Sequence, residues 1–378
     1  MGKRNKNIGR IKRYNHNFYR SGRSFWIKRI LLAAALVGVV FVLGFVLAPA
    51  VLDWGTHLWY TAVQQPSPEQ PDTPIESAQP DAQTPDAPVE PAETPTPTPA
   101  PAYAPGSMQV LRISALQTPE AIAKTAQSLK EQGVAYGIVP LKDESGYLYY
   151  NSAVPQAAAS VAATVIDPAA VARELTAQGI RPVASIAAFK DPMADRGMSI
   201  RYAGMDYNWL DNKAEAGGKR WMNPYSEQAV QYIGDLIQEA KDMGFEIVLL
   251  SGVQFPRQES PKQDFGDTQG RDRAAQLQAD IAAWEARFAG SVTLLYEVPY
   301  EVCITPSTTL GGSMPGALGM KNLVLRMPAA EGEQDPEASA VPVTQDEVLA
   351  SLYAGGVERI ALRSGIQGEV MPSPAAAQ

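Results

Sequence analysis

The side chains that can do chemistry in most of this chain are carboxylates, amines, guanidiniums and hydroxyls. The 378-residue sequence has two histidines, His16 and His57, and one cysteine, Cys303. Without a histidine after residue 57, Ser-His-Asp and Cys-His catalysis and His-ligated zinc are excluded from the remainder. The chain also lacks a P-loop and a Gly-rich dinucleotide motif. We therefore expect no cofactor and no metal, and the segment "YEVCITP" indicates an ordinary buried thiol.

Several carboxylates follow runs that are typical of β-strands and are candidates for acid–base chemistry. They are Asp143, Glu144, Asp191, Glu297 and Glu301. Asp143 and Glu144 can instead build a turn with Gly146. Asp191 can form an Asx turn or pair with Lys190. Ser251 ends the strand-like run "FEIVLLS", and without a histidine it has no evident base to activate it as a nucleophile.

The elements that must position these side chains alternate between strands and helices. Strands are predicted at 109–115, 135–141, 182–189, 245–251, 292–298, 322–328 and 358–364. Helices between them begin at the N-caps Thr118, Asp167 and Thr344, two of which precede a proline. This pattern favours an α/β fold, a (β/α)8 TIM-like barrel, over an open doubly wound sheet. We expect the eighth strand to be short or to lie within 299–320.

Long segments follow the second and third predicted strands, whereas three to five residues follow the helices. The chemistry should therefore lie at the carboxyl ends of the strands. The loop after the third strand has five candidates for sugar binding, namely Tyr207, Trp209, Asp211, Trp221 and Asn223. Aromatic rings with polar edges suit the apolar face and hydroxyls of a pyranose. Alternatively, the two tryptophans pack the loop onto the barrel, and Asn223 caps the following helix.

The N-terminal region has a composition unlike the rest. Residues 1–29 hold ten Lys or Arg and no acid, residues 30–52 carry no charge, and thirteen prolines lie between Pro66 and Pro105. We predict a basic cytoplasmic arm (1–29), a transmembrane signal-anchor helix (30–52), a juxtamembrane and Pro-rich linker (53–107), the barrel (108–370) and a disordered tail (371–378). A cleaved signal peptide ending near Ala48-Pro49-Ala50 is the alternative. The basic arm fits a topology signal at anionic lipid better than nucleic-acid binding.

Four segments resemble motifs of a bacterial family of membrane-anchored, glycoside hydrolase-like proteins whose domain of uncharacterised function has an α-amylase-like TIM barrel. They are "PLKDESGYLYYNS", "ASIAAFKDPMA", "GMDYNWLDNKAEAGGKRWMNPYSEQA" and "MGFEIVLLSGVQFP". The resemblance implies a glycan partner and puts Lys142 and Lys190 among the substrate-binding candidates. It also shows departures at the site. The family's strand-four Asp is Ser251, its Tyr and Arg neighbours are Gly252 and Gln254, and the Asp of its "DVK" is Pro140.

Glycoside hydrolysis uses two carboxyls, about 5 Å apart for retention or about 6.5–9.5 Å apart for inversion. The expected pair would combine Glu297 with Asp191 or Asp143, since Ser251 occupies the expected nucleophile position. One hypothesis is therefore a single-pass bacterial membrane protein whose extracytoplasmic barrel hydrolyses envelope or extracellular polysaccharide. A second is an inactive barrel that binds glycan or protein, and a third is a structural spacer. No nucleic-acid partner is expected, and no protein partner is identified.

Overall fold

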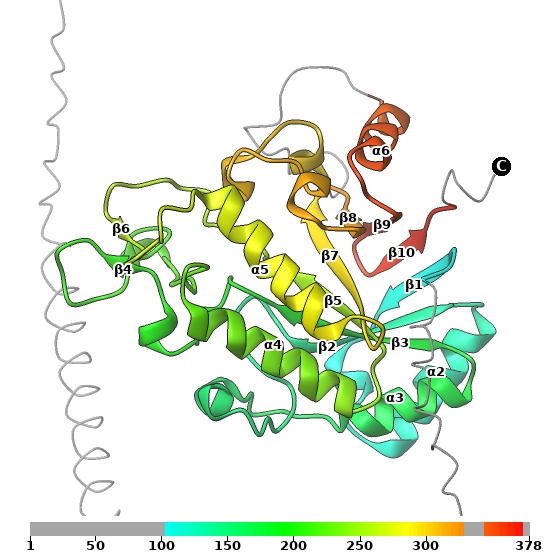
Figure 1. The fold of residues 1–378 in the computed structure, drawn as a ribbon. Helices are drawn as coiled ribbons and strands as arrows, with labels where there is room; N and C mark the ends of the chain where they lie inside the picture. Colours follow the sequence, from blue (N-terminus) through cyan, green and yellow to red (C-terminus); the bar gives the residue numbers. More distant parts are fainter. Residues whose placement is uncertain (1–102, 329–343, 373–378) are drawn as a thin grey trace, which may run out of the picture. The chain divides into compact units, whose positions relative to one another are not determined.

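The computed structural model describes residues 103–328 and 344–372, which form a closed eight-stranded barrel (Figure 1). The strands are β1 (Gly106–Val110), β2 (Tyr136–Lys142), β3 (Arg181–Ala187), β5 (Ile247–Ser251), β7 (Thr293–Pro299), β8 (Asn322–Arg326), β9 (Arg359–Ser364) and β10 (Gln367–Val370). Around the barrel they run in the order β1-β10-β9-β8-β7-β5-β3-β2. The predicted TIM-like barrel is confirmed at this level.

The eighth strand differs from the prediction in place and direction. It is β10, which pairs antiparallel with both β9 and β1, whereas the other neighbouring pairs are parallel. Only Gly365 and Ile366 separate β9 from β10, and a two-residue hairpin connects antiparallel strands only. The region 299–320 instead holds three short 3₁₀ helices, at Tyr300–Cys303, Thr308–Leu310 and Gly316–Leu318. The first strand was also predicted too late, because Ile113–Ala115 is a 3₁₀ helix.

In the part of the chain that the structure describes, five α-helices lie along the outside of the barrel. They are α2 (Pro119–Glu131), α3 (Pro168–Ala177), α4 (Glu227–Asp242), α5 (Arg273–Phe288) and α6 (Gln345–Ala354). The predicted N-caps are confirmed, because Thr118, Asp167 and Thr344 each accept a hydrogen bond from a backbone N–H of the first turn. Thr344 also forms a capping box with Glu347.

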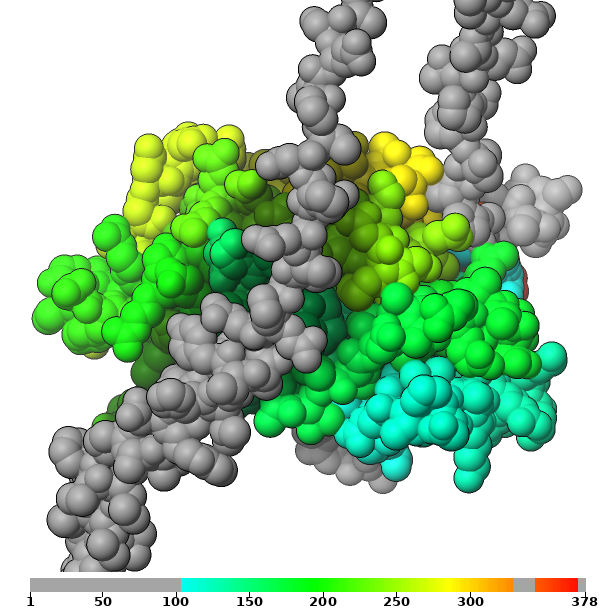
Figure 2. Space-filling view, turned by 90° about the horizontal axis from the view of Figure 1, so that it is seen from below, coloured from blue at the N-terminus to red at the C-terminus, as the bar shows by residue number. Residues whose placement is uncertain are grey.

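The loops divide the barrel into two unlike faces. Three or four residues separate each helix from the next strand, whereas 25 residues or more separate β2 from α3 and β3 from α4. The loops after β3 and β5 also pair with each other through β4 (Arg201–Tyr202) and β6 (Gln263–Asp264). Figures 1 and 2 show this pair as a projection at one side of the barrel. The longest loops therefore lie at the carboxyl ends of the strands, as predicted.

The barrel interior is filled by apolar side chains that alternate along the strands. Ile247 and Leu249 of β5, Leu295 of β7, Val324 of β8 and Ala361 of β9 belong to one buried cluster. Since side chains alternate with a period of two, the next inward positions towards the carboxyl ends are occupied by a different set. They are Ser251, Glu297, Arg326 and Arg363. The polar layer of the barrel thus begins where the apolar core ends.

Within the described residues, no helix is both long and apolar enough to cross a membrane. The predicted basic arm (1–29), anchor (30–52) and most of the linker lie outside the described residues, as does most of the predicted tail.

Candidate functional site

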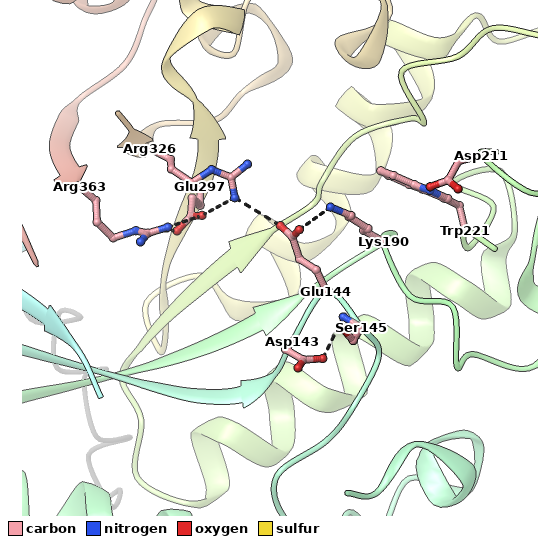
Figure 3. Close-up of polar contacts among 9 residues, drawn as sticks. All are labelled: Asp143, Glu144, Ser145, Lys190, Asp211, Trp221, Glu297, Arg326 and Arg363. Carbon is pink, nitrogen blue, oxygen red and sulfur yellow. Dashed lines mark hydrogen bonds and ion pairs between the residues drawn. The ribbon is translucent and has the colours of Figure 1, made fainter. Parts of the chain in front are cut away.

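A row of alternating charges crosses the carboxyl-terminal mouth of the barrel (Figure 3). We call it the mouth network, and its members are Lys190, Glu144, Arg326, Glu297 and Arg363. Glu144 follows β2 and Arg326 ends β8, which are four strands apart in either direction around the barrel. The network therefore joins opposite walls across the centre of the mouth.

The two acids of the network come close enough for two-carboxylate chemistry. Glu144 Oε1 and Glu297 Oε1 lie 3.6 and 3.4 Å from the same nitrogen, Nη1 of Arg326. The two oxygens are therefore at most about 7 Å apart, the sum of those distances, an upper limit that is compatible with the spacing used by glycosidases. Glu144 was a sequence candidate beside Asp143, and the structure brings Glu144 rather than Asp143 towards Glu297.

The network also holds both acids as ion-paired carboxylates. Arg363 donates from Nε and Nη2 to Glu297 at 3.1 and 2.8 Å, a bidentate pair that is mostly buried. Lys190 Nζ lies 2.6 Å from Glu144 Oε2. Burial alone would raise the pKa of Glu144, but Lys190 and Arg326 together bring it below its ordinary value. A general acid needs a raised pKa, so this environment opposes proton donation by Glu144.

Asp191 lies in a different place, beneath the long loops. Its Oδ2 is 2.9 Å from Lys142 Nζ, and both side chains are fully buried. Asp191 Oδ1 accepts hydrogen bonds from the backbone N–H groups of Met193 and Ala194, and Lys142 donates to the carbonyl of Ala187. Burial lowers the pKa of Lys142, and the Asp191 carboxylate opposes that shift. The pair fixes the loop after β3 to the end of β2, away from the open cavity.

Asp143 builds a turn. Its Oδ1 accepts from the N–H groups of Ser145 and Tyr147, and its Oδ2 accepts from the Tyr149 hydroxyl at 2.7 Å. Gly146 completes the turn at a φ of +84°, where a Cβ would collide with Asp191 Oδ1. The bonds of Asp143 therefore go to its own loop, and none reaches a member of the mouth network.

Ser251 lies between Ala187 of β3 and Glu297 of β7 in the strand register. Gly252 follows with a φ of +64°, and a Cβ at this position would lie 3.2 Å from the Cβ of Lys190. A tyrosine, which the family resemblance places at this position, would be strained there. The backbone at the end of β5 is thus shaped for glycine, with Lys190 packed against it.

An open cavity of about 330 Å³ lies beside the mouth network, between the loops after β3, β5 and β7. Its polar lining includes Lys190, Arg257, Arg326, Gln254 and Glu301. Another part of the wall consists of hydroxyl side chains, those of Thr305, Ser307, Thr308 and Thr309. A second hollow shares Trp221 and Arg257 with this one and extends to Asp211 and Lys219. Because they share these two lining residues, the two hollows adjoin, and we refer to them together as the polar groove.

The aromatic candidates are divided between the core and the projection. Trp209 and Trp221 are about 5% exposed or less and pack with Ile200. Trp221 Nε1 donates to Asp211 Oδ2 at 2.9 Å (Figure 3). Tyr207 is 54% exposed and stacks on Tyr202 in the β4–β6 projection. The tryptophans therefore hold the loop together, and among the aromatic candidates Tyr207 offers a ring to solvent.

Asn223 also serves the loop. Its Nδ2 donates to the carbonyl of Phe265, and its Oδ1 accepts from the N–H of Tyr225. The alternative in which Asn223 caps the next helix is wrong, because α4 has Ser226 as its N-cap. The buried thiol predicted at Cys303 is confirmed.

Sequence reasoning missed the two arginines that organise the site. Arg326 and Arg363 lie in the predicted strands "NLVLRMP" and "ERIALRS", each as the basic residue that follows the apolar run. An arginine at the carboxyl end of a barrel strand points to the functional face, so the signal was present. Among residues 103–328 and 344–372, no group of His, Cys, Asp or Glu is arranged to hold a metal ion.

Residues 111–289 match a protein family described as "Putative glycosyl hydrolase domain". No curated protein sequence matches the chain significantly. Among solved structures, a hypothetical protein from Ruminiclostridium thermocellum shares 18% identity over 50% of this chain and 96% of its own, with a TM-score of 0.43.

Two larger enzymes are also similar in structure. A Flavobacterium johnsoniae chitobiase shares 11% identity over 69% of this chain, with a TM-score of 0.44. A cycloisomaltooligosaccharide glucanotransferase from Paenibacillus sp. shares 10% identity over 68% of this chain, with a TM-score of 0.48. The chain spans 38% of the length of each. At such scores these similarities assign no activity, and the family match covers slightly less than half of the chain.

Proposed function

We propose that this protein is a glycoside hydrolase-like barrel that binds polysaccharide without cutting it. The polar groove beside the mouth network offers hydroxyl, amide and charged groups to a sugar chain. Its length over two adjoining hollows suits an oligosaccharide rather than a monosaccharide. The sequence adds an N-terminal anchor and a long spacer, which would place the barrel outside a bacterial membrane, near envelope or extracellular glycan.

One observation carries the non-hydrolytic part of this proposal: Arg326 stands between the two carboxylates that approach each other at the mouth. A glycosidase keeps one carboxyl protonated and the other ionised, by giving the two different environments. Here Glu144 and Glu297 share a guanidinium and each has a further cation of its own. Lys190 and Arg326 favour the ionised form of Glu144, and Ser251 supplies no third carboxyl.

A hydrolase is the second candidate, and the spacing of Glu144 and Glu297 favours it. At no more than about 7 Å, the pair has the separation that two-carboxylate catalysis requires. Such an enzyme would have to move Arg326 aside when substrate binds, leaving one acid free to take a proton. The sequence-derived choice of Asp191 as the partner of Glu297 fits less well, because Asp191 is buried against Lys142.

The two candidates separate in a single experiment on the full-length protein in detergent. Binding to a panel of soluble polysaccharides would be measured alongside release of reducing ends during prolonged incubation. We expect binding without turnover. Turnover that is lost in both Glu144→Gln and Glu297→Gln would establish the hydrolase instead. Absence of binding to every glycan would reject the proposed function.

A further inference from the structure

We propose that the groove selects an acidic polysaccharide, with Lys190 and Arg326 binding its carboxylate groups. This inference rests on the proposed function and names the class of glycan. The charge of the cavity wall is its starting point. The lining includes three cationic side chains, Lys190, Arg257 and Arg326, and one acid, Glu301.

This basic wall belongs to a chain that is otherwise acidic. After residue 29 the sequence has 22 basic and 40 acidic side chains. Anionic polymers are repelled by most of such a surface, so the basic wall of this cavity would direct their binding to one end of the groove, away from Asp211 and Glu259 of the adjoining hollow.

The contacts of Arg326 leave it available to a ligand. Its side chain is 43% exposed, and both of its ion pairs are long, at 3.4 Å to Glu297 and 3.6 Å to Glu144. Both pairs use Nη1 alone, although a guanidinium has five N–H donors arranged for bidentate binding of a carboxylate. Arg363, by contrast, binds Glu297 bidentately and is 13% exposed. Arg326 therefore has N–H donors with which to bind an incoming anion, whereas Arg363 keeps Glu297 in place.

Glu144 then has a defined part, as an internal competitor for the ligand. It occupies Lys190 and Arg326 in the free protein, as the carboxylate of an acidic sugar would in the complex (Figure 3). Ligand binding would exchange one carboxylate for another, so the two cations need never be left unpaired. Removing the charge of Glu144 should consequently improve binding of an acidic glycan, a direction that a damaged fold does not produce.

The test compares acidic polymers with carboxyl-reduced forms that keep the same backbone and linkages. Polygalacturonate, alginate and hyaluronan would serve as probes, and a polyglycerol phosphate would test a phosphate source. Dissociation constants would be measured by calorimetry at 50 and 500 mM NaCl. We expect the reduced forms to bind at least about tenfold more weakly, and added salt to weaken binding of the acidic forms.

Three variants locate the effect. Lys190→Gln and Arg326→Gln should each weaken binding of the acidic polymer by about tenfold, whereas Glu144→Gln should strengthen it. Arg287→Gln is the matched control, because Arg287 is similarly exposed and pairs with Asp235 away from the mouth.

Equal affinity for acidic and reduced polymers would overturn this inference and leave glycan binding intact. Tighter binding of the polyglycerol phosphate than of any uronate would overturn the choice of carboxylate. Binding of no polymer would overturn the proposed function itself.

Discussion

The buried pair of Lys142 and Asp191 gives the sharpest test of what the acids at this barrel mouth do. If Asp191 is structural, Asp191→Asn should unfold the protein more easily, since the fully buried Lys142 would lose its ion-pair partner and burial would lower its pKa further. Lys142 would retain its hydrogen bond to the carbonyl of Ala187 and an electrostatic attraction to Asp143, but it would lose its direct ion pair. Breaking one side of such a pair costs about 3–5 kcal/mol.

The same substitution on an exposed pair supplies the control. Asp235 lies 2.8 Å from Arg287, with about a third of each side chain exposed. Exposed pairs contribute about 0–1 kcal/mol, because water and salt screen them. Asp191→Asn and Asp235→Asn each replace one carboxylate by one amide. The difference between their losses of unfolding free energy therefore reports the effect of burial. The expected difference in unfolding free energy is about 3 kcal/mol or more.

Urea unfolding at pH 7, followed by tryptophan fluorescence, measures this difference. When the variants have the same m-value, the shift of the unfolding midpoint gives the change in unfolding free energy. A second variant, Lys142→Met with Asp191→Leu, removes both charges and should recover part of the loss. If Asp191→Asn unfolded at the wild-type midpoint while glycan turnover disappeared, Asp191 would be a catalytic acid, and the structural assignment would be refuted.

Three further outcomes are expected. Burial raises the pKa of Asp280 to about 8 from an ordinary 3.8, so the folded protein keeps a proton that the unfolded chain releases. Stability should therefore fall as pH rises from about 4 to about 8, by up to about 6 kcal/mol, and Asp280→Asn should remove that slope in urea titrations at pH 5, 7 and 9. Ser251→Asp should give at most slight hydrolysis in a reducing-end assay, and vigorous turnover would contradict the role given to the mouth network. Trp209→Ala should cost about 3–5 kcal/mol of stability, whereas Tyr207→Ala should cost less than about 0.5 kcal/mol, which paired thermal melts would check.

The parts of the fold that the sequence predicted are those set by neighbouring residues. Thr118 and Asp167 cap their helices through backbone N–H groups three residues away, and both are followed by a proline that starts the helix. Short apolar runs gave the parallel strands, which are five to seven residues long. The eighth strand, by contrast, is the four-residue segment Gln367–Val370. It has too few apolar residues to show a pattern, and its pairing with β9 and β1 defines it.

The site was harder to predict because its contacts join distant parts of the chain. Glu144 and Arg326 are 182 positions apart and meet because the barrel closes, which no local pattern encodes. The aromatic loop shows the opposite difficulty. A local cluster of rings suggested a binding surface, but Trp209 and Trp221 are buried in the packing of the loop. Tertiary packing decides whether a tryptophan ring is exposed to a sugar or buried in its own protein, and the sequence pattern does not.

Arg326 distinguishes the two candidate functions. A carboxyl pair at glycosidase distance is useful for hydrolysis only when one member can hold a proton, and Arg326 together with Lys190 lowers the pKa of Glu144. For a binder the same cation is an advantage, because it offers an unused face of donors to an anionic ligand. Ser251 alone does not decide between these outcomes, since an aspartate there would join Glu144 and Glu297 beside the same guanidinium. The chemistry of this barrel mouth is therefore set by the cation between the acids more than by the acid that is missing.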